Sequence, residues 1–167
     1  MEVREAAPGD WPAIWAIMEP VARAAETYCW DPAMDEDAGR AEWLPGPAGP
    51  DPTLRVFVAL DDGGSVVGTA QLHANRGGPG SHVANASFLV SHDAGGKGVG
   101  RGLADFVLGE ARSAGYTAMQ FNAVVQTNQR AVRLWTSLGF DTVGTVPDAF
   151  LHPVAGPTGL HIMHRML

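Results

Sequence analysis

Apolar residues at helical spacing mark the first third of the chain. From Trp11 to Ala25 they recur every three or four positions, which predicts a helix with one apolar face that ends near residues 26–28. A second, shorter helix is expected at residues 35–43, and a Pro- and Gly-rich loop at residues 45–52. The N-terminal region is therefore expected to be mainly helical.

Runs of apolar and β-branched residues predict strands in the rest of the chain. The turn sequence Asp61-Asp-Gly-Gly joins two of these strands as a hairpin. After residue 90 strands alternate with amphipathic helices, the last of which has Gly139 as its C-terminal cap. The expected strands are residues 3–5, 53–60, 65–73, 83–90, 118–124, 140–146 and 160–166, and the later helices are residues 99–114 and 128–138. This order predicts a partly parallel sheet with helices packed against it.

Composition narrows the class of protein. With 167 residues, 46% hydrophobic and 17% charged, the chain is typical of one globular domain spanning residues 1–167. Its formal net charge of -7 argues against nucleic acid or a membrane surface as a partner. The N-terminus has no signal-peptide pattern and no long apolar run occurs, so a cytoplasmic protein is expected. The single cysteine, Cys29, excludes an internal disulfide and is expected to be a small buried residue.

A glycine-dense turn, Gly95-Gly-Lys-Gly-Val-Gly100, follows an apolar strand and opens a helix. Free backbone N–H groups and the positive end of the helix dipole can hold a phosphate there, and Lys97 and Arg101 add positive charge. A flexible connection with incidental glycines is the alternative. The turn is not a P-loop, because Lys97 is followed by Gly98, and it is not a dinucleotide fingerprint, because Leu103 stands in place of the last glycine.

Two segments together resemble a known family. The glycine turn resembles the pyrophosphate turn of GNAT superfamily N-acetyltransferases, Q/R-x-x-G-x-G/A, and Asn128-Gln-Arg-Ala-Val-Arg-Leu-Trp-Thr-Ser-Leu-Gly-Phe140 resembles their second signature. Both stand in the family's order. The resemblance implies a three-layer α/β fold of the α+β type. Its central sheet is mixed and mostly antiparallel, with six to seven strands, a splay between the two central strands and helices on both faces.

The resemblance also implies acetyl-CoA as cosubstrate. The residues expected to bind it are Phe88, Leu89, Val90, Gly95, Gly96, Lys97, Gly98, Val99, Gly100, Arg101, Asn122, Asn128 and Trp135. Two positions depart from the family pattern. Gly95 stands where Gln or Arg is usual, so Lys97 or Arg101 is expected to compensate. Trp135 replaces the usual tyrosine acid, and because an indole N–H is not a usable acid, packing is expected for it.

The reaction implied is direct acetyl transfer to the primary or secondary amine of a small molecule, in a ternary complex. A free backbone N–H near Leu89 is expected to polarise the thioester carbonyl. Asn85 and Asn122, polar residues in apolar strands, are expected to hold the acceptor, although hydrogen bonds to nearby backbone would also explain them. Glu26 and Tyr28 are further catalytic candidates, in the connection that covers the acceptor site in the family. A solvated helix end is the alternative for Glu26.

The spacing of Asn85, Asn122 and Asn128 resembles that of fungal acetyltransferases acting on azetidine-2-carboxylate and other proline analogues, which favours an amino acid or analogue as acceptor. Three other functions stay open: a non-catalytic acetyl-CoA-binding regulator, a protein or peptide N-acetyltransferase, and a nucleotide-binding phosphotransferase. No metal site is expected, because His161 and His164 would point to opposite faces of a strand. A homodimer is expected only because the family often forms one.

Overall fold

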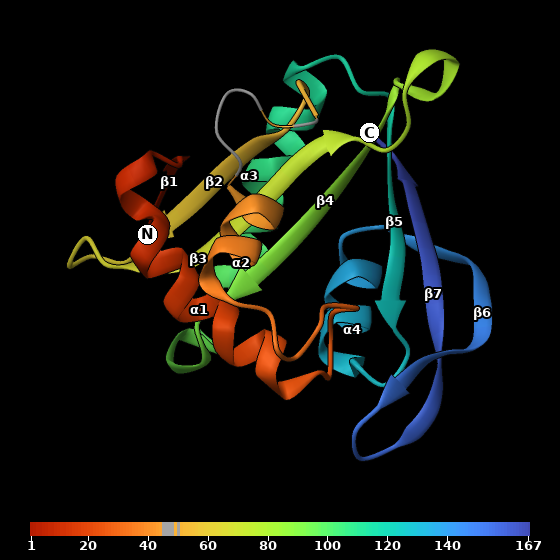
Figure 1. Ribbon diagram of the computed structural model, residues 1–167. Coiled ribbons are helices and arrows are strands. Elements are labelled where there is room, and N and C mark those ends of the chain that lie inside the picture. Colours follow the sequence, from red (N-terminus) through yellow and green to blue (C-terminus); the bar gives the residue numbers. More distant parts are fainter. Residues whose placement is uncertain (45–48, 50) are drawn as a thin grey trace.

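Seven strands form one twisted sheet in the computed structural model, which describes residues 1–44, 49 and 51–167 (Figure 1). The order across the sheet is β1-β2-β3-β4-β5-β7-β6, and every neighbouring pair is antiparallel except β4 and β5. The strands are β1 (Glu2–Glu5), β2 (Arg55–Leu60), β3 (Val66–Ala74), β4 (Val83–Val90), β5 (Ala118–Val125), β6 (Asp141–His152) and β7 (Gly156–Met166). The mixed, mostly antiparallel α/β fold expected from the sequence is confirmed.

In the described part of the chain, four α-helices cover the two faces of the sheet (Figure 1). They are α1 (Trp11–Ala24), α2 (Glu36–Trp43), α3 (Val99–Ser113) and α4 (Gln129–Ser137), and three single 3₁₀ turns lie at Pro8–Asp10, Gly78–Gly80 and His92–Ala94. Apolar residues of α1 and α2 pack with Val58 and Leu89 on one face, whereas those of α3 and α4 pack with Ala86 and Phe121 on the other. Each helix buries one apolar stripe, as its sequence period requires. Among the described residues, no helix combines the length and apolarity needed to cross a membrane.

The two central strands separate soon after they begin. Strands β4 and β5 pair only through Val83 with Ala118 and Ala84 with Met119, although each strand is 8 residues long. Beyond these two pairs the backbone groups of β4 that face β5 lose their partners in the sheet. The expected splay between the central strands is therefore present, and it leaves an opening in the middle of the molecule.

The predicted elements agree with the structure except at several ends. Helix α1 ends at Ala24, because Ala25 adopts a left-handed conformation with φ 52° that a helix cannot continue. The last hairpin is longer than expected, since β6 runs to His152 and β7 begins at Gly156. Its register shifts between Val146 and Phe150, so a bulge on this edge strand accommodates Pro147 and carries the strand beyond the expected end at residue 146. The loop expected at residues 45–52 lies largely outside the described residues.

Candidate active site

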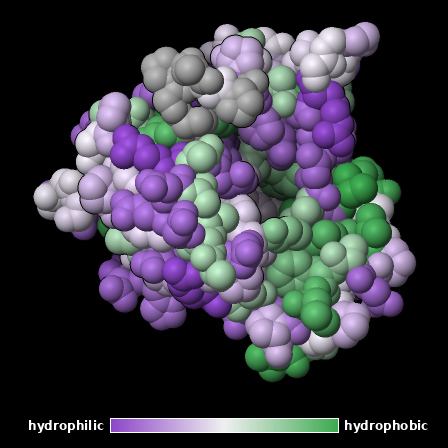
Figure 2. Space-filling view, viewed as in Figure 1, coloured by the Kyte–Doolittle hydropathy of each residue, from purple (hydrophilic) through white to green (hydrophobic). Residues whose placement is uncertain are grey.

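A cleft of about 330 Å³ occupies the opening between β4 and β5. Its walls are residues 85–88 of β4 and residues 121–125 of β5, and residues 27–30 after α1 form a third side. In the space-filling view the surface is hollowed between the α1–α2 half of the molecule and the β6–β7 half (Figure 2). The cleft therefore exists because the central strands separate.

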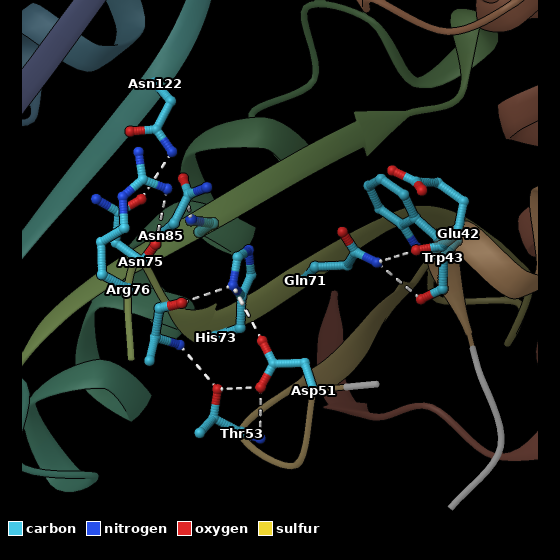
Figure 3. A network of polar contacts seen from close by, with 12 residues as sticks. Glu42, Trp43, Asp51, Thr53, Gln71, His73, Asn75, Arg76, Asn85 and Asn122 are labelled. Carbon is cyan, nitrogen blue, oxygen red and sulfur yellow. Dashed lines mark hydrogen bonds and ion pairs between the residues drawn. The ribbon is translucent and has the colours of Figure 1, made fainter. Parts of the chain in front are cut away.

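The two asparagines expected to hold a substrate both line this cleft, on the same face of the sheet (Figure 3). The Oδ1 atom of Asn85 accepts a hydrogen bond from the N–H of Ala86 at 2.9 Å, and its amide nitrogen has no partner among the described residues. Asn122 uses both ends of its amide, since it donates to Asn75 Oδ1 at 2.7 Å and accepts from Gln120 Nε2 at 2.9 Å. Asn85 thus keeps a free donor, whereas Asn122 is held in a network.

Tyr28 takes the place of a strand partner for Phe88. Its hydroxyl donates to the Phe88 carbonyl at 2.9 Å and accepts from the Phe88 N–H at 3.0 Å. Burial raises the pKa of Tyr28 above its ordinary value, against the opposing effect of the hydrogen bond with Phe88. Since its hydroxyl is engaged with backbone and its pKa is raised, the structure places Tyr28 as a support of the cleft wall.

The backbone N–H groups of β4 alternate between β3 and the opening. Ser91 donates to Val67 of the β3 side at 2.9 Å, so the N–H of Leu89, two residues before, also points to β3. The N–H groups that face the opening are those of Ala86, Phe88 and Val90. The sequence analysis expected a free N–H near Leu89. In the structure the N–H groups of Ala86 and Phe88 are bonded to Asn85 Oδ1 and to the Tyr28 hydroxyl, and that of Val90 has no partner in the described chain.

Two side chains that line the cleft, those of Glu42 and Trp30, were not singled out by the sequence. Glu42, the last residue but one of α2, contributes the one charged side chain among the described residues that line the cleft. Its carboxylate accepts from Trp30 Nε1 at 3.4 Å, and its backbone carbonyl accepts from the buried amide of Gln71 at 2.9 Å (Figure 3). Trp30 stacks on Tyr28 with ring centroids 4.0 Å apart. No sequence signal identifies these residues, because only packing of α2 on β3 turns Glu42 toward β4.

Cys29 and Glu26 lie differently from the sequence expectation. Cys29 is exposed and lines the cleft rather than being buried in the core. Partial burial raises the pKa of its thiol, which keeps the thiol protonated. Glu26 is exposed and lines a neighbouring hollow of about 440 Å³, together with residues of α1 and of the segment after β4. The structure therefore does not bring Glu26 to the cleft.

A second pocket of about 370 Å³ lies over the glycine turn at the start of α3. The helix has Gly98 as N-cap, with φ 81° and no side-chain cap, so the first N–H groups of α3 have no partner in the described chain. An uncapped helix start with glycine around it is suited to bind phosphate. The pocket shares Phe88, Asn128, Ala131 and Trp135 with the cleft, so the two form one continuous path.

The expected cofactor residues divide into those that line this pocket and those that do not. The first group is Phe88, Val90, Gly96, Gly98, Gly100, Arg101, Asn128 and Trp135. The second group is Leu89, Gly95, Lys97, Val99 and Asn122, of which Leu89 and Val99 are buried in the two cores and Asn122 lines the cleft. Arg130 and Leu134 line the pocket and were not expected. The sequence predicted the helix that carries them, but not which of its faces lines the pocket.

Asn128 and Trp135 hold α4 against this path. Asn128 caps α4, with its Oδ1 accepting from the Ala131 N–H at 3.1 Å. Trp135 is 7% exposed and packs against Phe88 and Phe121, with ring centroids 4.9 and 4.7 Å apart. The packing expected for Trp135 is what the structure shows. Arg101 donates to Ser137 Oγ at 2.6 Å, which ties the start of α3 to the end of α4.

Comparison with known proteins places these features in a family. Residues 11–140 match the family model described as Acetyltransferase (GNAT) family. A GCN5-related N-acetyltransferase from Kribbella flavida has 49% identity and a TM-score of 0.93, over 99% of this chain and 97% of that one. The ribosomal-protein-alanine N-acetyltransferase of Brucella melitensis has 26% identity and a TM-score of 0.85 over the full length of both chains.

Two other proteins bear on the ligand and on the extent of the likeness. The Salmonella typhimurium protein yncA, solved with its cofactor acetyl-CoA, has 25% identity and a TM-score of 0.80 over 100% of this chain and 94% of that one. N-acetyltransferase aca1 of Schizosaccharomyces pombe is 39% identical over 85 residues, which are 51% of this chain. The chain spans only 41% of the length of that curated relative.

Proposed function

Because the chain belongs to the GNAT acetyltransferase family and uses acetyl-CoA, we propose that it acetylates the primary or secondary amine of a small molecule, an amino acid or an amino-acid analogue. Transfer is direct, in a ternary complex. The amine nitrogen forms a bond to the acetyl carbon, the carbon–sulfur bond breaks, and CoA leaves as a thiolate. The nitrogen gives up one proton to solvent and the thiolate takes one.

One observation carries this proposal: the cleft is small, walled on three sides and continuous with the pocket over the glycine turn, which we call the phosphate pocket. Its volume of about 330 Å³ suits a small molecule, and Phe88 and Trp135 line both spaces. A thioester whose phosphates lie at the start of α3 can therefore place its acetyl end between β4 and β5. An amine that enters the cleft meets the acetyl group there, and positioning supplies much of the rate.

The charge of the cleft favours a cationic amine. Glu42 is the one charged side chain lining it in the described part of the chain, and its field attracts an ammonium group and repels an anion. The free amide nitrogen of Asn85 offers a donor to a carboxylate or carbonyl of the acceptor. An acceptor that carries an amine and a carboxyl group, as an amino acid does, uses both features.

Backbone groups supply the polarisation in this proposal, and no side chain acts as an acid. The N–H of Val90 faces the opening without a partner in the described chain and is the donor available to the thioester carbonyl, whereas the N–H of Phe88 is bonded to the Tyr28 hydroxyl. The leaving thiol has an ordinary pKa of about 8.5, so solvent protonates it without help. The raised pKa of the Cys29 thiol argues against an acetylated cysteine intermediate and supports direct transfer.

An acceptor screen tests the proposal. Free thiol release from acetyl-CoA is measured with amino acids, cyclic secondary amino acids, the same amines without the carboxyl group, and short peptides, and each product is identified by mass. We expect N-acetylation of amino acids or their cyclic analogues. Acetylation of peptides alone would replace the proposal by a peptide acetyltransferase. Tight acetyl-CoA binding with no turnover on any amine would replace it by a non-catalytic regulator.

Matched variants then test the cleft with the best acceptor. Asn85→Ala should lower kcat/KM for the amine by about tenfold to a hundredfold, because it removes a hydrogen bond to a charged group. Asn122→Ala should act mainly on thermal stability, since both ends of that amide are bonded within the protein. Equal kinetics for Asn85→Ala and the parent would remove Asn85 from the site.

Glu42→Gln should raise KM for cationic amines by roughly threefold to tenfold with kcat little changed.

We further propose that two copies of the chain associate through the edge strand β6. This strand ends the sheet, and its outer backbone groups have no partner strand in the described structure. Val143, Val146 and Leu151 on β6 and Val154 in the following turn are exposed, and Figure 2 shows apolar side chains gathered over this hairpin. An apolar, unpaired edge of this length is suited to self-association.

A further inference from the structure

The glycine at position 95 is explained by packing and not by backbone conformation. Gly95 has φ -60° and ψ 135°, which any residue adopts. A Cβ atom added there would lie 3.0 Å from the His92 carbonyl oxygen and 3.1 Å from Nη1 of Arg130. The guanidinium of Arg130 therefore lies in the space that a side chain at position 95 would enter.

Arg130 reaches this place from the other side of the pocket. It is the second residue of α4, which Asn128 caps, and it lines the phosphate pocket together with Gly96, Gly98 and Gly100. Its backbone is fixed by the helix while its guanidinium lies against the glycine turn. One charged group is thus positioned next to the uncapped N–H groups at the start of α3.

The charge of Arg130 is not neutralised within the described structure. Its guanidinium makes no ion pair or hydrogen bond there, whereas Arg4 and Arg55 pair with carboxylates and Arg101 bonds to Ser137. The hollow next to the pocket is lined by Arg130, by the carboxylates of Glu26 and Asp93 and by His92, and none of these pairs with Arg130. A planar guanidinium beside free N–H groups is suited to a phosphate.

We propose that Arg130 binds the pyrophosphate of acetyl-CoA. It takes the role of the Gln or Arg side chain that is usual at position 95 and that Gly95 lacks. The cation is supplied by α4 rather than by the turn, and glycine at position 95 leaves the room that the guanidinium needs. Lys97 does not line the pocket. Arg101 lines it, but its Nη2 donates to Ser137 Oγ, so its guanidinium is oriented toward the end of α4, while that of Arg130 lies against the glycine turn.

Calorimetry with CoA tests this assignment. Arg130→Gln should raise the Kd for CoA by about tenfold to a hundredfold, because it removes charge-assisted hydrogen bonds. Arg130→Lys should lose less. The control is Arg133→Gln, an exposed arginine on the same helix that lines neither pocket, which should leave the Kd within about twofold of the parent. Melting temperature without ligand verifies that each variant is folded.

Truncated ligands identify the phosphate. With 3′-dephospho-CoA the Arg130→Gln effect should stay the same, and with acetyl-pantetheine, which has no phosphate, the variant and parent should have equal KM. An effect that disappears with 3′-dephospho-CoA would assign Arg130 to the 3′-phosphate and overturn the proposal. An unchanged Kd for CoA in folded Arg130→Gln would also overturn it.

A double-mutant cycle tests the packing of Gly95 against Arg130. Gly95→Ala places a methyl group 3.1 Å from Nη1 and should displace the guanidinium, so it should weaken CoA binding in the parent. In the Arg130→Gln background the same substitution should have a much smaller effect, because the group that it displaces is absent. Equal losses in both backgrounds would show that position 95 acts independently of Arg130.

Discussion

At the scale of single residues, the cleft depends on side chains that complete an interrupted strand. Where β4 leaves β5, the N–H of Ala86 is bonded by the Asn85 side chain and the N–H of Phe88 by the Tyr28 hydroxyl. A backbone N–H that loses its strand partner needs another one if it is not to be buried alone. These residues therefore stabilise the open form of the sheet, on which the site depends.

Tyr28→Phe tests whether Tyr28 only supports the cleft wall or also acts in catalysis. The substitution removes both hydrogen bonds to Phe88 but keeps the ring that stacks on Trp30. We expect a loss of roughly 1–2 kcal/mol in the free energy of unfolding, or about 2–8 °C in Tm for a domain of this size. Because the phenol is engaged and its pKa is raised, kcat should stay within about tenfold of the parent.

Thermal denaturation and steady-state kinetics on one preparation check this expectation. A general acid typically contributes at least about a hundredfold to the rate. A fall in kcat of that size in a variant that is folded at the assay temperature would therefore make Tyr28 a catalytic residue.

At the scale of elements, the start of α3 has features that lower the stability of the helix and that suit it to bind an anion. The helix begins without a side-chain cap, and its first residues include Gly100 and Gly102, each unfavourable in a helix by about 1 kcal/mol relative to alanine. By contrast, α4 is capped by Asn128 and α2 by Asp35, whose Oδ1 accepts from the Ala38 N–H at 2.9 Å. The start of α3 thus combines a missing side-chain cap with two glycines, and it lines the pocket over the glycine turn.

Gly100→Asp should have opposite effects on helix stability and on ligand binding. A Cβ at Gly100 would make only ordinary contacts, at 3.6 Å to Leu134 and 3.7 Å to Val90, and a carboxylate in the first turn of a helix is stabilising by about 0.3–1 kcal/mol. Tm should therefore be equal to or higher than that of the parent. Affinity for CoA should fall at least about tenfold, because the carboxylate would stand where we propose that the phosphate binds.

The matched control is Gly100→Asn, which has the same shape without the charge. Calorimetry with CoA and melting temperatures of both variants give the comparison. If Asn and Asp lowered the affinity equally, bulk and not charge would be responsible, and the anion site would have to lie elsewhere on the turn.

At the scale of the whole molecule, the sheet has a protected end and an open one. Strand β1 is only 4 residues long, whereas β6 extends over 12 residues and is exposed along most of its length. Short edge strands limit association, and long apolar ones favour it. The proposed dimer would cover the β6 edge and leave the cleft, on the other side of β5, open to acetyl-CoA and amine.

Leu151→Asp and Val154→Asp test the dimer. These side chains are 76% and 86% exposed, so charge there should not affect folding of the chain but should repel a second copy. Light scattering coupled to gel filtration should give twice the 17.6 kDa chain mass for the parent and the chain mass for the variants. Gly109→Asp, at an exposed position on α3, is the control and should remain dimeric. A parent that is monomeric at tens of micromolar would contradict the proposal.

The sequence by itself determined the local features of this protein. Most helices and strands follow from the spacing of apolar residues, and the glycine turn and the Asn128 segment indicated the cosubstrate. These signals lie within short stretches of chain, where the pattern of neighbouring residues is sufficient. The errors lie at the ends of elements, as in β6, whose bulge between Val146 and Phe150 carries the strand beyond the expected end at residue 146.

Only the tertiary structure decided which side chains meet in the cleft. Glu42 reaches it because Gln71 of β3 holds the end of α2, and Arg130 reaches the glycine turn because α4 packs beside it. Asn85 and Asn122 read alike in the sequence, yet one keeps a free donor and the other is bonded at both ends. Such differences depend on contacts between residues tens of positions apart, which packing and strand pairing establish and which no local pattern records.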